Sequence, residues 1–190
     1  VCSSDLGIRS DSDMFTLGFK AMPWRQPLSI ADGPSILSYL QRVARDSGVD
    51  TLIRYRKRVV DMQWSSARCE WQVTVADSSD GKEEILRTKF VHLCTGYYDY
   101  QQAHRPAFEG EQDFRGRIVH PQFWPADLDH RGLRVVIVGS GATAVTLGPA
   151  MSDTAAHVTM LQRSPSFVAN QPSIDPWARV LERFLPAAIA

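Results

Sequence analysis

The sequence of 190 residues predicts an α/β fold in which an antiparallel β-meander precedes a β-α-β unit. Three observations predict it. Three strand-like runs lie between residues 57 and 89, an apolar run at 134–138 enters a Gly-x-Gly-x-x-Ala turn, and a second apolar run follows at 157–162. Together these patterns indicate two differently built regions in one chain.

Residues 7–14 come first and are rich in polar and turn-forming side chains. Their spacing alone is as typical of a solvated Asx turn as of a binding loop. A helix is then predicted from Asp32, which can cap it, with Pro34 in the first turn and Gly48 just past its end. Apolar residues between these signals recur at helical spacing.

The meander is predicted from strands at Lys57–Trp64, Glu70–Ala76 and Glu84–Lys89. Asp80-Gly81 between the last two is a strong hairpin signal, so these strands are expected to be antiparallel. The next run, Phe90–Tyr98, predicts a buried strand that ends in a glycine turn and contains a packed Cys94.

A proline-interrupted connector follows up to Arg131, and the β-α-β unit begins at Arg134. Gly139 permits a tight turn, Gly141 lets a pyrophosphate approach the backbone, and Ala144 lets helix and strand pack closely. A helix over Val145–Met151 completes a Rossmann-like dinucleotide-binding pattern, since its N-terminus supplies unpaired N–H donors. Beyond the unit, an amphipathic helix is predicted over 177–185.

The second strand of this unit ends at Gln162-Arg163-Ser164, without a carboxylate. A carboxylate there would bind the 2′-hydroxyl of NAD, whereas arginine accepts the 2′-phosphate of NADP. The pattern therefore favours NADPH, and the alternative is that Arg163 is a solvated surface charge.

Composition excludes several classes of function. The 21 basic and 21 acidic residues balance, and no basic face indicates nucleic acid as a partner. No apolar run is long enough to span a bilayer, so membrane association is not expected from this segment. The three cysteines lack metal-ligand spacing and form no Cys-x-x-Cys, which predicts no metal and a reducing, cytoplasmic setting.

A longer motif carries a family resemblance. Residues 114–125 read Phe-x-Gly-x-x-x-His-x-x-x-Trp-Pro, with the fixed positions Phe114, Gly116, His120, Trp124 and Pro125. This string resembles the fingerprint of flavin-dependent Baeyer–Villiger monooxygenases. The string at 9–19 is most similar to the ethionamide-activating branch of that family, and the resemblance extends over roughly residues 7–190.

The resemblance implies a flavoprotein with FAD and NADPH as cofactors on two dinucleotide-binding domains. It implies a partial FAD-binding domain at 1–100, an interdomain connector with the fingerprint at 101–131, and a partial NADP-binding domain at 132–190. The implied reaction inserts one oxygen atom from O2 into a ketone, or adds it to the sulfur of a thioether or thioamide.

The resemblance also assigns roles to residues. Asp11 matches an acidic residue beside the flavin ring, and His120 matches a supporting residue that couples domain movement to cofactor binding; these two are the expected catalytic residues. The implied cofactor-binding residues are Arg9, Ser10 and Asp11 near the nicotinamide and flavin, Val59, Thr95 and Gly96 at the FAD, Gly139, Ser140, Gly141, Ala142, Thr143 and Ala144 at the pyrophosphate, and Arg163 and Ser164 at the 2′-phosphate. From the residues alone, Thr95-Gly96 is equally typical of a plain strand end.

Two features of the family lie outside the sequence. The first FAD-binding glycine motif would precede residue 7, and the active-site arginine would follow residue 190. We therefore expect a central fragment that is inactive by itself. The competing functions are an N- or S-oxygenating flavin monooxygenase and, less favoured without Cys-x-x-Cys, a flavin disulfide or quinone reductase.

Overall fold

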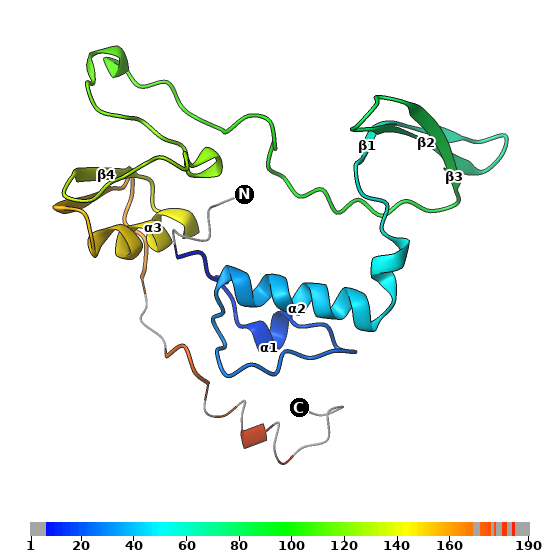
Figure 1. The fold of residues 1–190 in the computed structure, drawn as a ribbon, viewed down its shortest axis with the longest axis horizontal. Helices are drawn as coiled ribbons and strands as arrows, with labels where there is room; N and C mark the ends of the chain where they lie inside the picture. The colour runs from blue at the N-terminus through cyan, green and yellow to red at the C-terminus, as the bar shows by residue number, and fades with distance from the viewer. Residues whose placement is uncertain (1–6, 169–171, 176, 178–179, 182–183, 185–190) are drawn as a thin grey trace. The chain divides into compact units, whose positions relative to one another are not determined.

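The chain folds into a helical N-terminal region, an antiparallel sheet and a parallel β-α-β unit (Figure 1). The structure is a computed structural model that describes residues 7–168, 172–175, 177, 180–181 and 184. The chain divides into two compact units, one formed by Val1–Val43 with Tyr100–Ala190 and the other by Ala44–Asp99. Within the described residues, no helix has the length and apolar character needed to cross a bilayer.

The helices and strands are, in chain order, α1 (Met14–Leu17), α2 (Gly33–Asp46), the 3-10 helix η2 (Val49–Leu52), β1 (Lys57–Ser65), β2 (Glu70–Asp77), β3 (Glu83–Thr88), the 3-10 helices η3 (Glu111–Asp113) and η4 (Pro121–Phe123), β4 (Arg134–Val138), α3 (Ala142–Ser152) and β5 (His157–Leu161). The helix predicted from Asp32, the three meander strands and the β-α-β unit are confirmed. Most of the helix predicted over 177–185 lies outside the described residues.

A small buried cluster supports the N-terminal region. Met14, Trp24, Ala31 and Tyr39 pack together, and Trp24 is fully buried. The indole Nε1 of Trp24 donates to the carbonyl of Leu28 at 2.9 Å, and the Tyr39 hydroxyl donates to the carbonyl of Met22 at 2.7 Å. These bonds satisfy the polar atoms of two buried aromatic side chains and fix the loop between α1 and α2.

The start of α2 follows the sequence signals. The backbone N–H of Ser35 donates to Asp32 Oδ1 at 2.7 Å, which is the bond of an N-cap. This bond lowers the pKa of the Asp32 carboxyl, because it stabilises the charged form. Gly48 follows the helix with a φ of 72°, a conformation that glycine adopts without strain.

The antiparallel sheet has the strand order β1-β2-β3. The central strand β2 carries the buried residues of this sheet, Val73, Val75 and Ala76. The turn between β2 and β3 contains Gly81 at a φ of 72°, and its N–H donates to the carbonyl of Asp77. The hairpin predicted from Asp80-Gly81 is therefore confirmed.

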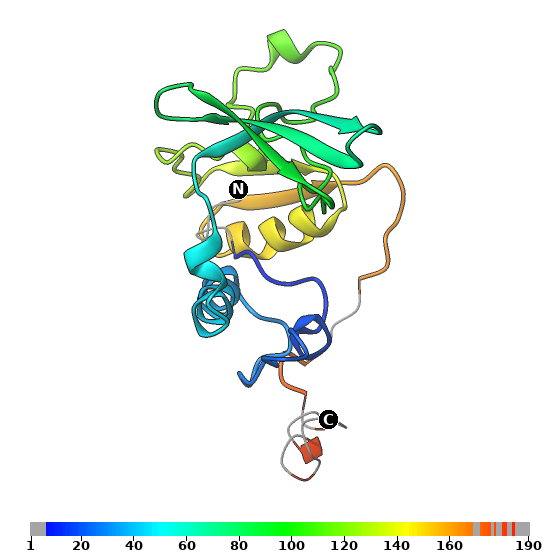
Figure 2. The same cartoon turned by 90° about the vertical axis from the view of Figure 1, so that its right-hand side faces the viewer.

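The second sheet is the parallel pair β4-β5, joined through α3 (Figure 2). Ile137 of β4 packs against Ala144, Leu147 and Met151 of α3, and this cluster is the core of the unit. The sheet and the helix each bury one apolar face in this way. The α/β class with an antiparallel meander is confirmed.

The prediction of a buried strand over Phe90–Tyr98 is wrong. The segment has no regular secondary structure, and Phe90, Leu93 and Cys94 are exposed. A strand needs a neighbour for its backbone hydrogen bonds, and within the described residues no strand pairs with this segment. Only the glycine turn forms, with Gly96 at a φ of 70°.

Candidate functional site

The glycine loop between β4 and α3 has the geometry of an anion cradle. Gly139 adopts a φ of +130°, which an L side chain rarely adopts, and its N–H donates to the carbonyl of Leu161 at 2.9 Å. Gly141 is the N-cap of α3 and offers no side-chain cap, and a Cβ added there would meet nothing within 4 Å. The N-terminus of α3 therefore has open space at Gly141, as an anion-binding helix N-terminus requires.

Ala144 lies in the first turn of α3 and is buried in the core cluster with Ile137. A larger side chain at this position would separate the helix from the strand. The packing role predicted for Ala144 is confirmed, and it fixes the helix N-terminus next to the glycine loop.

Arg163 and Ser164 lie at the same edge of the sheet as the glycine loop. In the parallel register Val138 is paired with Leu161, so Gly139 and Gln162 leave the two strands at the same level. Arg163 and Ser164 follow directly and are exposed. Ser166, further along this loop, donates its hydroxyl to Ser140 Oγ at 3.0 Å, which ties the loop after β5 to the glycine loop.

The segment 114–125, which carries the fingerprint, packs onto the β-α-β unit through Trp124. Trp124 is half-buried against the cluster that contains Ile137 and Leu147. His120 caps η4, because its Nδ1 accepts the backbone N–H of Gln122 at 3.2 Å. This bond requires Nδ1 to be unprotonated.

The glycine of the fingerprint has a steric explanation. A Cβ added at Gly116 would lie 2.5 Å from the ring of Phe114, well inside contact distance. The Phe114 ring therefore lies against the backbone of Gly116, and any larger residue would displace it. The spacing Phe-x-Gly encodes this contact.

A pocket of about 130 Å³ brings the separate motifs together. Arg9 and Asp11 come from the N-terminal loop, Pro121 from the fingerprint, and Thr143 from the first turn of α3. The remaining lining residues are Ile8, Ala142, Thr146 and Leu147. Sequence reasoning missed Thr146, although its spacing of three from Thr143 places both on one face of the helix.

Ser10 is engaged with the backbone next to this pocket. Its hydroxyl accepts the N–H of Ala31 at 3.0 Å, and its own N–H donates to the carbonyl of Ala31 at 2.8 Å. Arg9 also forms an isolated bridge with Asp32. These bonds hold the loop against the start of α2 and leave Asp11 exposed at the pocket.

Val59, Thr95 and Gly96 belong to the other compact unit. Val59 lies in β1 at the irregularity between Val59 and Asp61, and its side chain is about half exposed. Thr95 and Gly96 lie in the extended segment after β3. Their assigned contacts with FAD stay predictions.

Comparison with known proteins identifies relatives of this chain. Residues 22–185 match the family described as "Flavin-binding monooxygenase-like". The chain is 49% identical over 185 residues to "FAD-containing monooxygenase EthA" of Mycolicibacterium smegmatis (strain ATCC 700084 / mc(2)155), covering 97% of this chain and 37% of that protein. The chain thus spans little more than a third of the length of this relative.

Solved structures show the same fold. "Oxidized steroid monooxygenase bound to NADP" is 27% identical with a TM-score of 0.70, covering 93% of this chain and 33% of its own. "Crystal Structure of OTEMO complex with FAD and NADP (form 1)" is also 27% identical, with a TM-score of 0.66 and coverage of 84% and 31%. The resemblance indicated by the fingerprint and by the string at 9–19 is confirmed. The chain belongs to the flavin-binding monooxygenase-like family.

Proposed function

We propose that this chain forms the NADPH-binding and part of the FAD-binding region of a monooxygenase. The enzyme transfers one oxygen atom from O2 into a ketone, or onto the sulfur of a thioether or thioamide. The observation that carries the proposal is the pocket lined by Arg9 and Asp11, by Pro121 within the segment 114–125, and by the first turn of α3. One of the similar structures contains FAD and NADP and the other contains NADP, which supports the same pair of cofactors.

The glycine loop fits the phosphates of NADPH. Gly139 and Gly141 leave room for a pyrophosphate over the N-terminus of α3, whose first turn contains no acidic side chain. Arg163 and Ser164 would hold the 2′-phosphate, through a planar guanidinium and a neutral hydroxyl. We therefore assign residues 132–190 to NADP binding and 101–131 to the connector that carries the fingerprint.

Residues 1–100 are assigned to FAD binding. Val59 would contact FAD through its backbone, and Thr95 and Gly96 would form a turn near the flavin. Asp11 and Arg9 would face the flavin and the nicotinamide from the pocket. FAD, when bound and reduced by NADPH, supplies the activation of O2 that amino-acid side chains cannot. The chain would contribute charge, because the Asp11 carboxyl and the Arg9 guanidinium both line the pocket.

The cofactor assignment is tested with Arg163→Ala. The host is a chimera in which this chain replaces the corresponding 185 residues of the Mycolicibacterium smegmatis relative. Hydrogen bonds to charged groups contribute about 1.5–3 kcal/mol, so kcat/KM for NADPH should fall roughly ten- to a hundred-fold while NADH is hardly affected. Arg131→Ala, an exposed arginine before β4, is the control. An unchanged preference between the two cofactors contradicts the assignment.

The oxygenation reaction is tested by product analysis in the same chimera. A cyclic ketone that yields a lactone supports insertion next to a carbonyl, and a thioether that yields a sulfoxide supports transfer to sulfur. Sulfoxide without lactone would favour the N- or S-oxygenating alternative. NADPH oxidation without either product would contradict both assignments.

A further inference from the structure

An ion pair between Arg117 and Asp127 closes a loop of residues 118–126, which contains the fingerprint positions His120, Trp124 and Pro125. Arg117 Nη1 lies 3.3 Å from Asp127 Oδ2, and Arg117 Nη2 lies 3.1 Å from Asp127 Oδ1. Two parallel N–H···O bonds between a guanidinium and a carboxylate fix direction as well as distance. The bonds from Arg117 also keep the pKa of the Asp127 carboxyl below its ordinary value. The Asp127 carboxyl therefore stays charged at neutral pH.

The residues between the two partners are those that reach the site. Trp124 anchors the loop on the core cluster of the β-α-β unit, and Pro121 lines the pocket with Arg9 and Asp11. His120 precedes Pro121 and caps η4. The anchor at Trp124 fixes one point of the loop, while the ion pair joins its two ends.

We propose that Arg117 and Asp127 are positioning residues that hold the His120-Pro121 part of the fingerprint loop at the pocket. Neither residue lines the pocket itself. They act by closing the loop, because joined ends leave the intervening residues fewer conformations. The effect of this closure on catalysis rests on the proposed function, whereas the closure itself does not.

Because the ion pair is exposed, salt should weaken it, whereas salt should not weaken the apolar contact of Trp124. The side chains of Arg117 and Asp127 are 49% and 78% exposed. An exposed ion pair is weak and is screened by salt, whereas the apolar contact of Trp124 is not. The order of residues 118–126 should therefore decrease as the salt concentration rises.

The closure is tested by amide hydrogen exchange in the chain itself. We expect Arg117→Glu and Asp127→Arg each to accelerate exchange in residues 118–126 about two- to five-fold at low salt. The charge-swapped double variant should restore protection, and high salt should remove the differences. The control is Arg131→Glu, which breaks the pair between Arg131 and Asp129 that encloses only one residue. Unchanged exchange in the single variants, or no recovery in the double variant, would overturn the proposal.

The consequence for catalysis is measured in the chimera with the Mycolicibacterium smegmatis relative. The fraction of NADPH oxidised that yields oxygenated product should fall two- to five-fold in each single variant and recover in the double swap. A loop that loosens without any change in this fraction would overturn the positioning role. A chimera that never oxygenates would instead contradict the proposed function, and the exchange measurement would still decide the closure.

Discussion

The two sheets of this chain are stabilised in different ways. In the parallel pair β4-β5, Ile137 is buried beneath Leu147 and Met151 of a helix that also joins the strands. In the antiparallel sheet, burial is confined to the central strand, and Trp64 and Ile85 on the outer strands are exposed. We infer that the parallel sheet depends on its side-chain core. The antiparallel sheet depends more on the backbone hydrogen bonds between its strands and on polar side-chain contacts.

This difference bears on the position of the glycine loop, which we propose binds the phosphates of NADPH. A glycine loop must present its N–H groups in a fixed direction, so the strand and helix on either side of it must be rigid. The buried cluster beneath α3 provides that rigidity, and Ala144 belongs to both the loop motif and the cluster. Among the described residues, the antiparallel sheet has no such cluster under a helix of its own, and its strand β1 is irregular between Val59 and Asp61.

The largest effect is expected from Leu147→Ala. Leu147 is 5% exposed at the centre of the β-α-β cluster. Removing its side chain leaves a cavity, and such substitutions cost about 2–5 kcal/mol. Native-state hydrogen exchange of the α3 and β4 amides measures this loss. The matched control is Val136→Ala on the exposed face of β4, which should change exchange little. Equal effects of the two variants would contradict a one-sided core.

The fold was predictable where its determinants are local. The hairpin at Gly81 and the β-α-β unit rely on turn residues and on pairs of strands that are close in sequence, and both formed as predicted. The segment 90–98 has an equally apolar pattern, yet it stays extended and exposed. The apolar pattern of a sequence shows which residues can form a strand. Whether they form it depends on backbone hydrogen bonds to a neighbouring strand.

The candidate site also combines features with local determinants, which the sequence predicts, and features that depend on long-range contacts. Gly139 and Ala144 were predicted from spacing, because the positive φ of Gly139 and the burial of Ala144 are local steric demands. Gly141 was predicted from the same motif, and its Cβ position is open. Asp11 and Thr143 line one pocket although they are far apart in the sequence, and no spacing in the sequence predicts this. For the same reason the ion pair between Arg117 and Asp127 could not be read from the sequence.

A smaller effect is expected from Val75→Ala in the antiparallel sheet. Val75 is 3% exposed on the central strand, and burying a valine side chain contributes about 1.5–3 kcal/mol. Because the sheet lacks a covering helix within its own unit, we expect the lost stability to lie at the lower end of that range. Exchange of the β2 amides measures it, with Ile85→Ala as the exposed control. A loss larger than that of Leu147→Ala would reverse the proposed contrast between the sheets.

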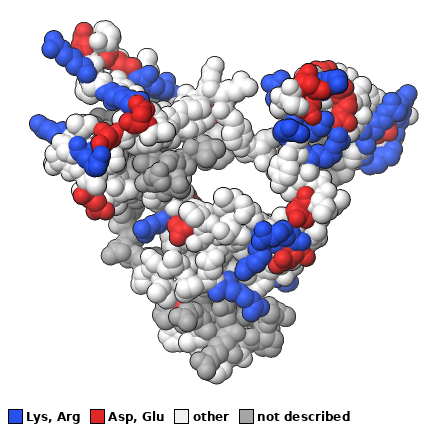
Figure 3. Space-filling model, in the orientation of Figure 1, with Lys and Arg blue, Asp and Glu red and all other residues white. Residues whose placement is uncertain are grey.

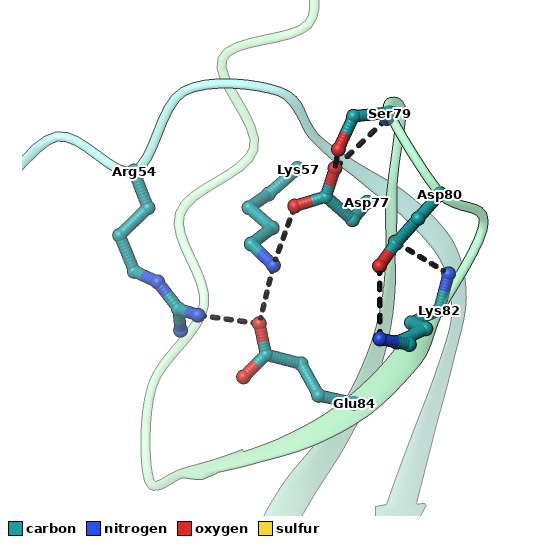
Figure 4. A network of polar contacts seen from close by, with 7 residues as sticks. All are labelled: Arg54, Lys57, Asp77, Ser79, Asp80, Lys82 and Glu84. Atoms are coloured by element: carbon teal, nitrogen blue, oxygen red, sulfur yellow. Dashed lines mark hydrogen bonds and ion pairs between the residues drawn. The ribbon is translucent and has the colours of Figure 1, made fainter.

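The smallest effect concerns the polar network at one end of the antiparallel sheet (Figure 4). Charged side chains of both signs gather on this unit (upper right in Figure 3). Lys57 Nζ lies 3.1 Å from both Asp77 Oδ2 and Glu84 Oε1, and Arg54 also pairs with Glu84. Bonds from Ser79 and then Lys57 lower the pKa of Asp77, and a bond from Lys57 lowers the pKa of Glu84. The same two carboxylates raise the pKa of Lys57.

These shifts fix the sign of the pH dependence. A carboxyl whose pKa is lower in the folded state stabilises the fold above its unfolded pKa, about 3.9 for Asp and 4.3 for Glu, and this contribution is lost as pH falls through the folded value. The β2 and β3 amides should therefore lose protection below about pH 5, and an Asp77→Asn, Glu84→Gln double variant should lose less over the same interval. Glu83→Gln, on the opposite face of β3, is the control. Because the side chains of the network are partly exposed, the difference should shrink in high salt. The same loss of amide protection in the double variant and in the unmodified chain would contradict a stabilising role for these charges. The sheet would then depend on its backbone hydrogen bonds and on the burial of Val75.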